Sequence, residues 1–283
     1  MLPCPSVAVC APGPDASADG LLAAFDVTVD DDAQLAEVVA GISAAPLASM
    51  ALVGLLREPR AGDIGAVHRG LVAESLVYST LQSGPEFAAW LRSHQPRTVA
   101  AEDGPAVAAI RDGGDLVLEL NRPATRNAFS VEMRDALCEA LELVLVDDSI
   151  ERVVVRGRGP SFCSGGDLRE FGTFPDPATA HVVRCTRNAG RLLSMIAGRV
   201  RFEVHGACIG AGIELPAFAG RVVAARDAYF QLPELSMGLV PGAGGTTSIP
   251  RRIGRQRTAL MAITARAIDA ETALAWGLVD ELL

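Results

Sequence analysis

Residues 205–251 read HGACIGAGIELPAFAGRVVAARDAYFQLPELSMGLVPGAGGTTSIPR and contain two isolated acids. Glu214 is the only charged residue within 206–220, and Glu234 is the only one within 228–250. A carboxylate in apolar, glycine-rich surroundings loses hydration, so it requires a partner or a raised pKa. Either acid alone also fits a structural role, one in a first helical turn and the other in a surface turn. Together they are candidates for acid/base chemistry near neutral pH.

Composition places the chain among ordinary globular proteins. Of its 283 residues, 49% are hydrophobic and 21% are charged, and this length allows one large domain or two smaller ones. The net charge of -9 argues against a general affinity for nucleic acid or anionic membranes. No stretch approaches the ~18 apolar residues that cross a bilayer, and the N-terminus has no basic segment before its apolar residues. We therefore expect a cytoplasmic protein that binds neither nucleic acid nor membrane.

The six cysteines form no CxxC pair and are too sparse for a secreted disulfide scaffold, which predicts reduced thiols. A nucleophilic Cys163 paired with one of the four histidines would rest only on their presence in one chain, and core packing is the commoner role of such a thiol. His205 is expected to satisfy backbone groups at a turn. No cluster of His, Cys and Asp has the spacing of metal ligands, so no metal is expected.

Changes in composition divide the chain into four parts. Residues 1–20 are rich in Pro, Gly, Ala and Asp and predict a mobile tail. Residues 21–95 predict a small α/β unit of unknown role, in which FDVTVD is a strand, DDAQLAEVVAGI a helix, MALVGLLR a second strand, and two further helices follow. Residues 96–106 have the composition of a linker, and residues 107–283 form the core.

The core alternates strand, glycine turn and helix, which indicates an α/β domain. VAAIRDGG and DLVLELN predict a hairpin, VEMRDALCEALELVLVD a helix and RVVVRG a buried strand. GPSFCSGGDLREF predicts a glycine-rich turn leading into a helix. One long helix is expected near residues 178–197, and RVRFEVHG is the strand that leads into the segment with the two acids.

Two glycine-rich turns, residues 162–167 and 209–212, are expected to present unpaired backbone N–H groups. Such donors suit a phosphate or an oxyanion that develops during a reaction. A dinucleotide-binding turn would need glycine where Leu215 stands and a longer crossover helix. A phosphate-binding P-loop is excluded because no Lys-Ser/Thr follows either turn. A serine-hydrolase elbow at Ser164 would need glycine at both flanking positions, which are Phe162 and Gly166.

Six phrases of the core occur in a fixed order: NRPATRNAFS, FCSGGDL, HGACIGAGIELPAF, ARDAYFQLPELSMGLVPGAGGT, PRRIG and AWGLVDEL. Through them residues 107–280 resemble the crotonase superfamily, which comprises enoyl-CoA hydratases and isomerases. The resemblance implies a ββα spiral core that binds an acyl-coenzyme A. The expected fold class is therefore α/β, with a small α/β N-terminal unit before a crotonase-like core.

The resemblance also implies roles for individual residues. The thioester oxygen would accept hydrogen bonds from the backbone N–H groups of Ser164 and Ala211, which form an oxyanion hole. Glu234 would carry the main proton transfer, and Glu214 would position water and share the work of the base. Coenzyme A would be part of the substrate, so no separate cofactor is expected. The other residues implied in substrate binding are Arg126, Phe162, Gly165, Gly166, Asp167 and Gly212.

Hydration of an enoyl-CoA is the expected activity, because family members with only the second acid tend to be isomerases. Isomerisation and thioester hydrolysis are the alternatives within the family. An inactive acyl-CoA-binding or assembly protein is a further alternative, motivated by relatives that continue beyond the GLVDEL phrase with helices that pack subunits together. By analogy with the family we expect a homo-oligomer, a trimer or a hexamer. Relatives also lack a unit like residues 21–95.

Overall fold

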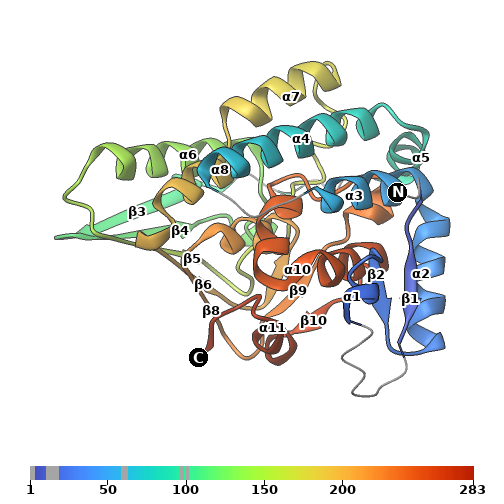
Figure 1. Cartoon of the computed structure of the whole chain (residues 1–283). Coiled ribbons are helices and arrows are strands. Elements are labelled where there is room, and N and C mark those ends of the chain that lie inside the picture. Colours follow the sequence, from blue (N-terminus) through green and yellow to red (C-terminus); the bar gives the residue numbers. More distant parts are fainter. Residues whose placement is uncertain (1–3, 11–18, 59–62, 96–98, 100–101) are drawn as a thin grey trace.

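The part of the chain from residue 107 onward is built around a six-stranded sheet (Figure 1). The computed structural model describes residues 4–10, 19–58, 63–95, 99 and 102–283. The strand order is β11-β8-β6-β5-β4-β3, with β3 antiparallel to β4 and the other neighbours parallel. The strands are β3 (Val107–Asp112), β4 (Asp115–Leu120), β5 (Arg152–Gly157), β6 (Val200–Val204), β8 (Arg221–Ala224) and β11 (Glu281–Leu282).

Alternation along the strands decides which face of the sheet is covered. In β4 every second residue is buried, at Leu116, Leu118 and Leu120, and a period of two places these side chains on one face. Helix α6 (Val131–Val146), whose buried side chains recur at helical spacing, packs against β3 and β4. The predicted hairpin, helix and buried strand in this region are confirmed.

A second sheet has the order β10-β9-β7. The chain passes from the first sheet into the second twice, after β6 and after β8. β7 follows β6 and leads into α9 (Ala211–Glu214), and β9 follows β8 and leads into the 3-10 helix η4 (Glu234–Met237). Because β7 and β9 are parallel neighbours, the segments after them emerge at the same edge. This repetition confirms the predicted α/β class and brings the two acids together. The strands are β7 (Ala207–Ile209), β9 (Tyr229–Gln231) and β10 (Ile268–Asp269).

Two helix predictions in the core were wrong. The glycine turn at 162–167 leads into bends and turns rather than a helix, because Gly172 has a φ of 77° and Pro175 cannot donate a backbone hydrogen bond. The helix expected near 178–197 is interrupted: α7 (Pro177–Thr186) ends, and α8 (Ala189–Ile196) begins after a new N-cap, Asn188, whose side chain accepts from the Arg191 N–H.

The N-terminal segment is more helical than predicted. The letters MALVGLLR belong to α3, not to a strand, because Pro46 starts a helix whose buried residues include Leu52 and Leu56. The mobile-tail prediction was wrong for Val7–Val9, which forms a strand parallel to Val27–Val29; residues 1–3 and 11–18 lie outside the described residues. The elements are β1 (Val7–Val9), α1 (Asp19–Leu22), β2 (Val27–Val29), α2 (Asp32–Ala44), α3 (Pro46–Arg57), α4 (Ile64–Gln82) and α5 (Pro85–Ser93).

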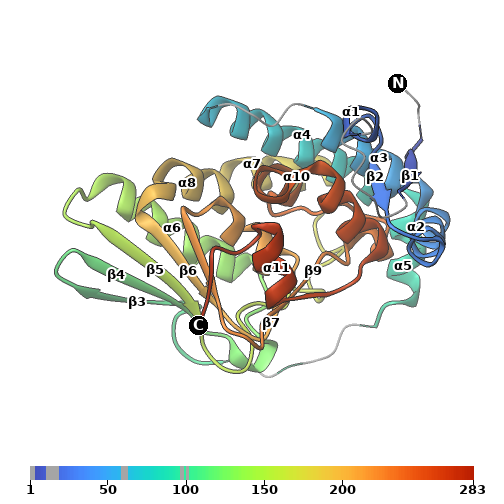
Figure 2. The same cartoon turned by 60° about the horizontal axis from the view of Figure 1, so that its bottom comes forward.

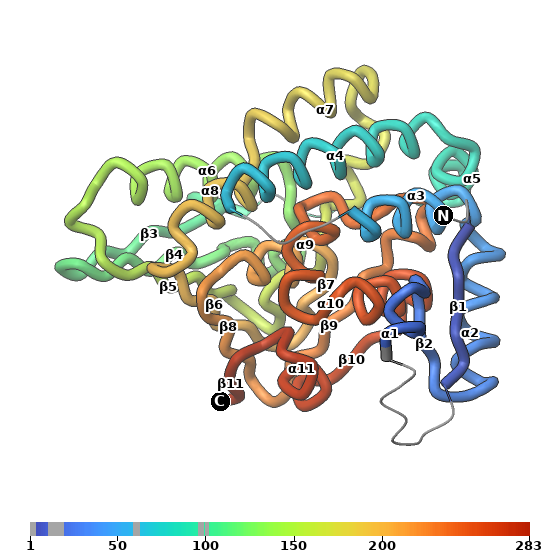
Figure 3. The backbone as a smooth tube through the Cα atoms, viewed as in Figure 1, coloured from blue at the N-terminus to red at the C-terminus, as the bar shows by residue number. Residues whose placement is uncertain are grey.

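Helix α10 (Gly245–Thr264) joins the N-terminal elements to the core. It packs against α2, α3, α4 and β2 and lies between the six-stranded sheet and α2 in two views (Figures 1 and 2). In Figure 3, α4 runs beside α7 above the core, although the two helices are far apart in the sequence.

Much of the predicted linker, 96–98 and 100–101, lies outside the described residues. The last helix, α11 (Ala270–Trp276), precedes β11.

No single helix among the described residues is long and apolar enough to cross a membrane. Only α2 and α3 taken together pass such a test, and they meet at a bend of 109°.

A buried ion cluster at Asp26 ties these parts to one another. Asp26 is 2% exposed and pairs with Arg57 of α3 at 2.6 Å and with Arg255 of α10 at 3.2 Å. Burial acts to raise the pKa of Asp26, but hydrogen bonds from Arg57 and Ser6 outweigh it and hold that pKa below its ordinary value. The folded protein therefore favours the ionised carboxylate, which binds both cations.

We expect Asp26→Asn to lower the free energy of unfolding by about 3 kcal/mol at pH 7, because it leaves two partly buried guanidinium groups without their anion. Urea denaturation measures the change, and Asp30→Asn, at an exposed acid four residues away, is the control. Since the native pKa of Asp26 is depressed, the difference between wild type and variant should shrink as the pH falls through that pKa. A loss no larger than that of the control would contradict the assignment.

Candidate active site

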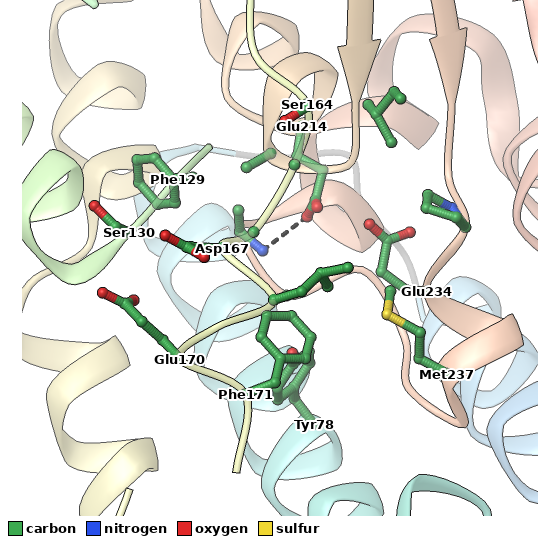
Figure 4. A pocket seen from close by; sticks show the side chains of 18 of the residues that line it. Tyr78, Phe129, Ser130, Ser164, Asp167, Glu170, Phe171, Glu214, Glu234 and Met237 are labelled. Carbon is green, nitrogen blue, oxygen red and sulfur yellow. Dashed lines mark hydrogen bonds between the residues drawn. The ribbon is translucent and has the colours of Figure 1, made fainter. Parts of the chain in front are cut away.

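A cavity of about 410 Å³ lies where the two glycine-rich turns meet α4, α7 and the start of α10. Both Glu214 and Glu234 line it, and Figure 4 shows their carboxyl groups pointing toward each other. The cavity thus gathers the two isolated acids that the sequence predicts. Other lining residues labelled in Figure 4 are Tyr78, Phe129, Ser130, Ser164, Asp167, Glu170, Phe171 and Met237.

Glu214 is anchored through one oxygen and open through the other. It is the last residue of α9 and is 2% exposed. Its Oε2 accepts hydrogen bonds from the Ala243 N–H at 2.7 Å and the Gly245 N–H at 2.8 Å. Burial raises the pKa of Glu214 well above its ordinary value, the charges of Glu234 and Glu74 raise it further, and the two N–H groups act against this rise.

Glu234 has an unpaired oxygen in a nearly dry place. The residue is 9% exposed and begins η4. Its Oε2 is buried and has no hydrogen-bond partner among the described residues. Burial raises the pKa of Glu234 to about 8, with a smaller contribution from the charge of Glu74. An oxygen left unsatisfied inside a cavity costs stability and is available to a bound molecule.

The backbone at Gly210 allows the two acids to approach each other. A Cβ on Gly210 would overlap Glu234 Oε1 and lie 3.6 Å from Glu214 Oε1, so both oxygens border the same small space. Gly210 also has a φ of 51°, which a residue with a side chain rarely adopts. Two buried carboxyl groups this close do not readily ionise together, so the pair holds at least one proton near neutral pH.

One predicted donor of the oxyanion hole was wrong. The Ser164 N–H donates to the Arg126 carbonyl at 3.0 Å and is therefore occupied. The neighbouring Gly166 N–H and the predicted Ala211 N–H line the same cavity, and neither has an acceptor within the described part of the chain. These two backbone groups are the donors that could stabilise negative charge on a bound oxygen. Sequence alone could not separate them from Ser164, because they lie in the same turns.

The predicted substrate-binding residues divide into two groups. Gly165, Gly166 and Asp167 line the cavity as expected. Phe162 does not, because its ring packs edge-on against Phe202 in the core at 5.9 Å and it is 2% exposed.

Gly212 and Arg126 also lie away from the described cavity lining. A Cβ on Gly212 would overlap the carbonyl of Cys163, so this glycine is needed for close packing of two backbone segments. Arg126 is exposed, and its left-handed backbone, with a φ of 53°, presents its carbonyl to Ser164. Sequence pattern located the turns correctly but not the direction of each group within them.

Helices α4 and α5 supply a wall that sequence analysis missed. Tyr78 and Trp90 line the cavity with His94, whose ring stacks on Trp90 at 4.4 Å. Arg184 of α7 lies over the Tyr78 ring at 4.7 Å, and Phe171 approaches Trp90 at 5.8 Å. The aromatic residues give the cavity a largely apolar side. No motif in residues 21–95 pointed to this role.

Cys163 behaves as a packing residue. It is 2% exposed, and burial raises the pKa of its thiol to about 12, so the nucleophilic thiolate is scarce at neutral pH. His205 Nε2 lies 2.8 Å from the Gly159 carbonyl, as expected of a histidine that satisfies a turn. The geometry therefore gives no support to Cys163 as a nucleophile.

Comparisons with known proteins agree with this geometry. Residues 112–283 match the family described as enoyl-CoA hydratase/isomerase. The chain is 36% identical over 175 residues to 1,2-epoxyphenylacetyl-CoA isomerase of Escherichia coli, covering 60% of this chain and 66% of that one. It is 36% identical over 167 residues to 2,3-dehydroadipyl-CoA hydratase of the same organism, covering 59% and 65%. The chain spans less than two thirds of the length of these two relatives.

The fold is also found among solved structures. An enoyl-CoA hydratase from Mycobacterium smegmatis superimposes with a TM-score of 0.58 at 33% identity, covering 64% of this chain and 70% of that one.

Glu234→Gln should stabilise the protein at alkaline pH. The raised pKa of Glu234 means that the contribution of this residue to stability is fully present below the ordinary value of 4.5 and is lost as the pH rises through about 8. The amide keeps the shape but cannot ionise. We expect the two melting temperatures to be close at pH 5 and the variant to melt at least about 4 °C higher at pH 9. Calorimetry between these pH values measures the gap; a gap independent of pH would contradict the assignment.

Proposed function

Because the chain belongs to the enoyl-CoA hydratase/isomerase family, we propose that its cavity binds an enoyl-coenzyme A thioester and adds water across the double bond. The observation that carries this proposal is the pair of facing buried acids, Glu214 and Glu234, beside two unpaired backbone N–H groups. Hydration requires a positioned water, a group that accepts its proton, a group that donates a proton to carbon, and donors for the oxyanion.

The acid pair can supply both proton transfers. A carboxylate accepts a proton from water as the hydroxyl oxygen bonds to the β-carbon, and a carboxylic acid gives a proton to the α-carbon. A pair that holds one proton has both forms present at once. We assign the main proton transfer to Glu234, because its Oε2 is unpartnered. Glu214, fixed by two backbone N–H groups, positions the water and shares the work of the base.

Negative charge develops on the thioester oxygen while the β-carbon is attacked. We place this oxygen between the N–H groups of Gly166 and Ala211. A backbone donor in such a position lowers the activation free energy by about 3 kcal/mol in comparable sites. Coenzyme A arrives as part of the substrate, so the proposed reaction needs no separate cofactor.

Double-bond isomerisation is the second candidate, favoured by the description of the family as enoyl-CoA hydratase/isomerase. The same acid pair would then move one proton between two carbons and add no water. Because the family description covers both reactions, product analysis rather than sequence distinguishes them.

Loss of either acid should abolish hydration. We expect Glu214→Gln and Glu234→Gln each to lower kcat at least about 10³-fold, because the amide keeps the shape and cannot transfer a proton. The loss of enoyl absorbance with crotonyl-CoA measures the rate. Glu37→Gln, at an exposed acid on α2, is the matched control and should retain wild-type activity. A variant of either cavity acid that keeps more than about a tenth of the wild-type rate would exclude its proposed role.

The oxyanion donors can be tested by removing an N–H group. Ala211→Pro deletes the donor at the first position of α9, where proline is compatible with a helix. We expect kcat/KM to fall about 10²- to 10³-fold, whereas Ala211→Gly, which keeps the N–H, should stay within about tenfold of the wild type. Melting curves show whether each variant is folded. Equal rates for the two variants would remove Ala211 from the site.

A further inference from the structure

Glu74 is a buried acid in the middle of α4, outside the residues that match the family. The residue is 2% exposed. Its Oε1 accepts from the Gly244 N–H at 2.7 Å, and its Oε2 accepts from the N–H and hydroxyl of Thr246 at 2.9 Å and 2.7 Å. Both oxygens act as acceptors, which is the pattern of an ionised carboxylate.

The same turn holds Glu214. The N–H groups of Ala243 and Gly245 point to Glu214, and those of Gly244 and Thr246 point to Glu74. Four successive donors around the start of α10 are therefore shared alternately by two carboxylates from distant segments. Because these donors have no partner within the helix, a change at either acid frees two of them and loosens the turn whose other two donors fix the second acid.

We propose that Glu74 is a positioning residue of the Glu214–Glu234 pair, which holds the turn 243–246 against Glu214 and keeps a third carboxylate beside the two acids. Through this residue, a segment that the family match does not include would help to build the site. The inference rests on the proposed function for its catalytic meaning, but the contacts on which it depends do not involve a substrate.

Electrostatics supports the geometry. The charge of Glu74 contributes to the raised pKa of both Glu214 and Glu234. Burial, the larger cause, would act even without it. Removal of the Glu74 charge should therefore lower both values without returning them to the ordinary range.

Other titratable groups near Glu74 are Tyr78 on its own helix and Arg184 on α7. Burial lowers the pKa of Arg184, and the charge of Glu74 acts against this fall. Burial raises the pKa of Tyr78; Arg184 opposes this rise, whereas the three glutamates add to it. His181 of α7 lies 2.9 Å from the Ser75 hydroxyl, beside Glu74 on α4, and contacts Cys185. The remaining charged side chains on α3, α5, α8 and α10 are exposed or have partners elsewhere: Arg57, Glu86, Arg92, Arg191, Arg251, Arg252, Arg255 and Arg257.

The test is a pH titration of the Glu234 carboxyl, followed by carbon NMR in protein labelled at the glutamate side-chain carboxyl. Loss of one signal in Glu234→Gln identifies the resonance. We expect Glu74→Gln to lower the Glu234 midpoint by about one pH unit. Glu74→Asp, which keeps the charge on a shorter side chain, should leave the midpoint within about 0.3 units of the wild type. Glu37→Gln is the control for a change at a distant acid.

An unchanged midpoint in folded Glu74→Gln would overturn the proposal. If that variant does not fold, Glu74→Asp carries the test instead, and a Glu234 midpoint that differs from that of the wild type by more than about 0.3 units would overturn the proposal.

Activity separates this inference from the proposed function. With crotonyl-CoA we expect Glu74→Gln to lower kcat at least about tenfold, with KM within about twofold, and to move the alkaline limb of the pH profile down by the same unit. A merely structural role would lower the amount of active enzyme without moving that limb. A wild type that is inert with enoyl thioesters would refute hydration, while the carboxyl titration would still decide the role of Glu74.

Discussion

Buried carboxylates held by backbone N–H groups are the constraint on which this structure depends. Glu214 and Glu74 are each 2% exposed, and they share the four donors of the turn 243–246. Backbone donors stabilise the charge without the full neutralisation that a lysine or arginine would give. Both acids therefore stay inside the protein, and Glu214 still retains a high proton affinity, which is the property that acid/base chemistry near neutral pH requires.

The fold creates this arrangement through the parallel pair β7 and β9. Each strand ends in a short helical segment, and the two segments carry Glu214 and Glu234 to the same edge. Gly210 lets the carboxyl groups approach each other. Helix α10 then contributes its first N–H groups from one side. Helix α4 places Glu74 against the same turn and Tyr78 in the cavity wall. The N-terminal helices are thus part of the wall of the cavity.

Sequence patterns predicted the core and the acid pair better than the surroundings. Strong alternation in β4 and the isolation of Glu214 and Glu234 are local signals; the structure places the β4 leucines in the core and both acids in one cavity. The Ser164 donor was wrong because the direction of an N–H group depends on backbone angles that letters do not reveal. MALVGLLR was wrong because an apolar run fits a buried helix as well as a strand. Glu74 was overlooked although it is the only charged residue within 70–85, the same signal that marked the other two acids.

The central claim is that the acid pair adds the elements of water to carbon atoms of a bound thioester. The most direct test is mass spectrometry of the product formed from crotonyl-CoA in water enriched in heavy oxygen. The account predicts one heavy oxygen in the hydroxyl group on the β-carbon of an intact thioester. An intact product without heavy oxygen would indicate isomerisation, and heavy oxygen in a released carboxylic acid would indicate thioester hydrolysis; either result would contradict the account.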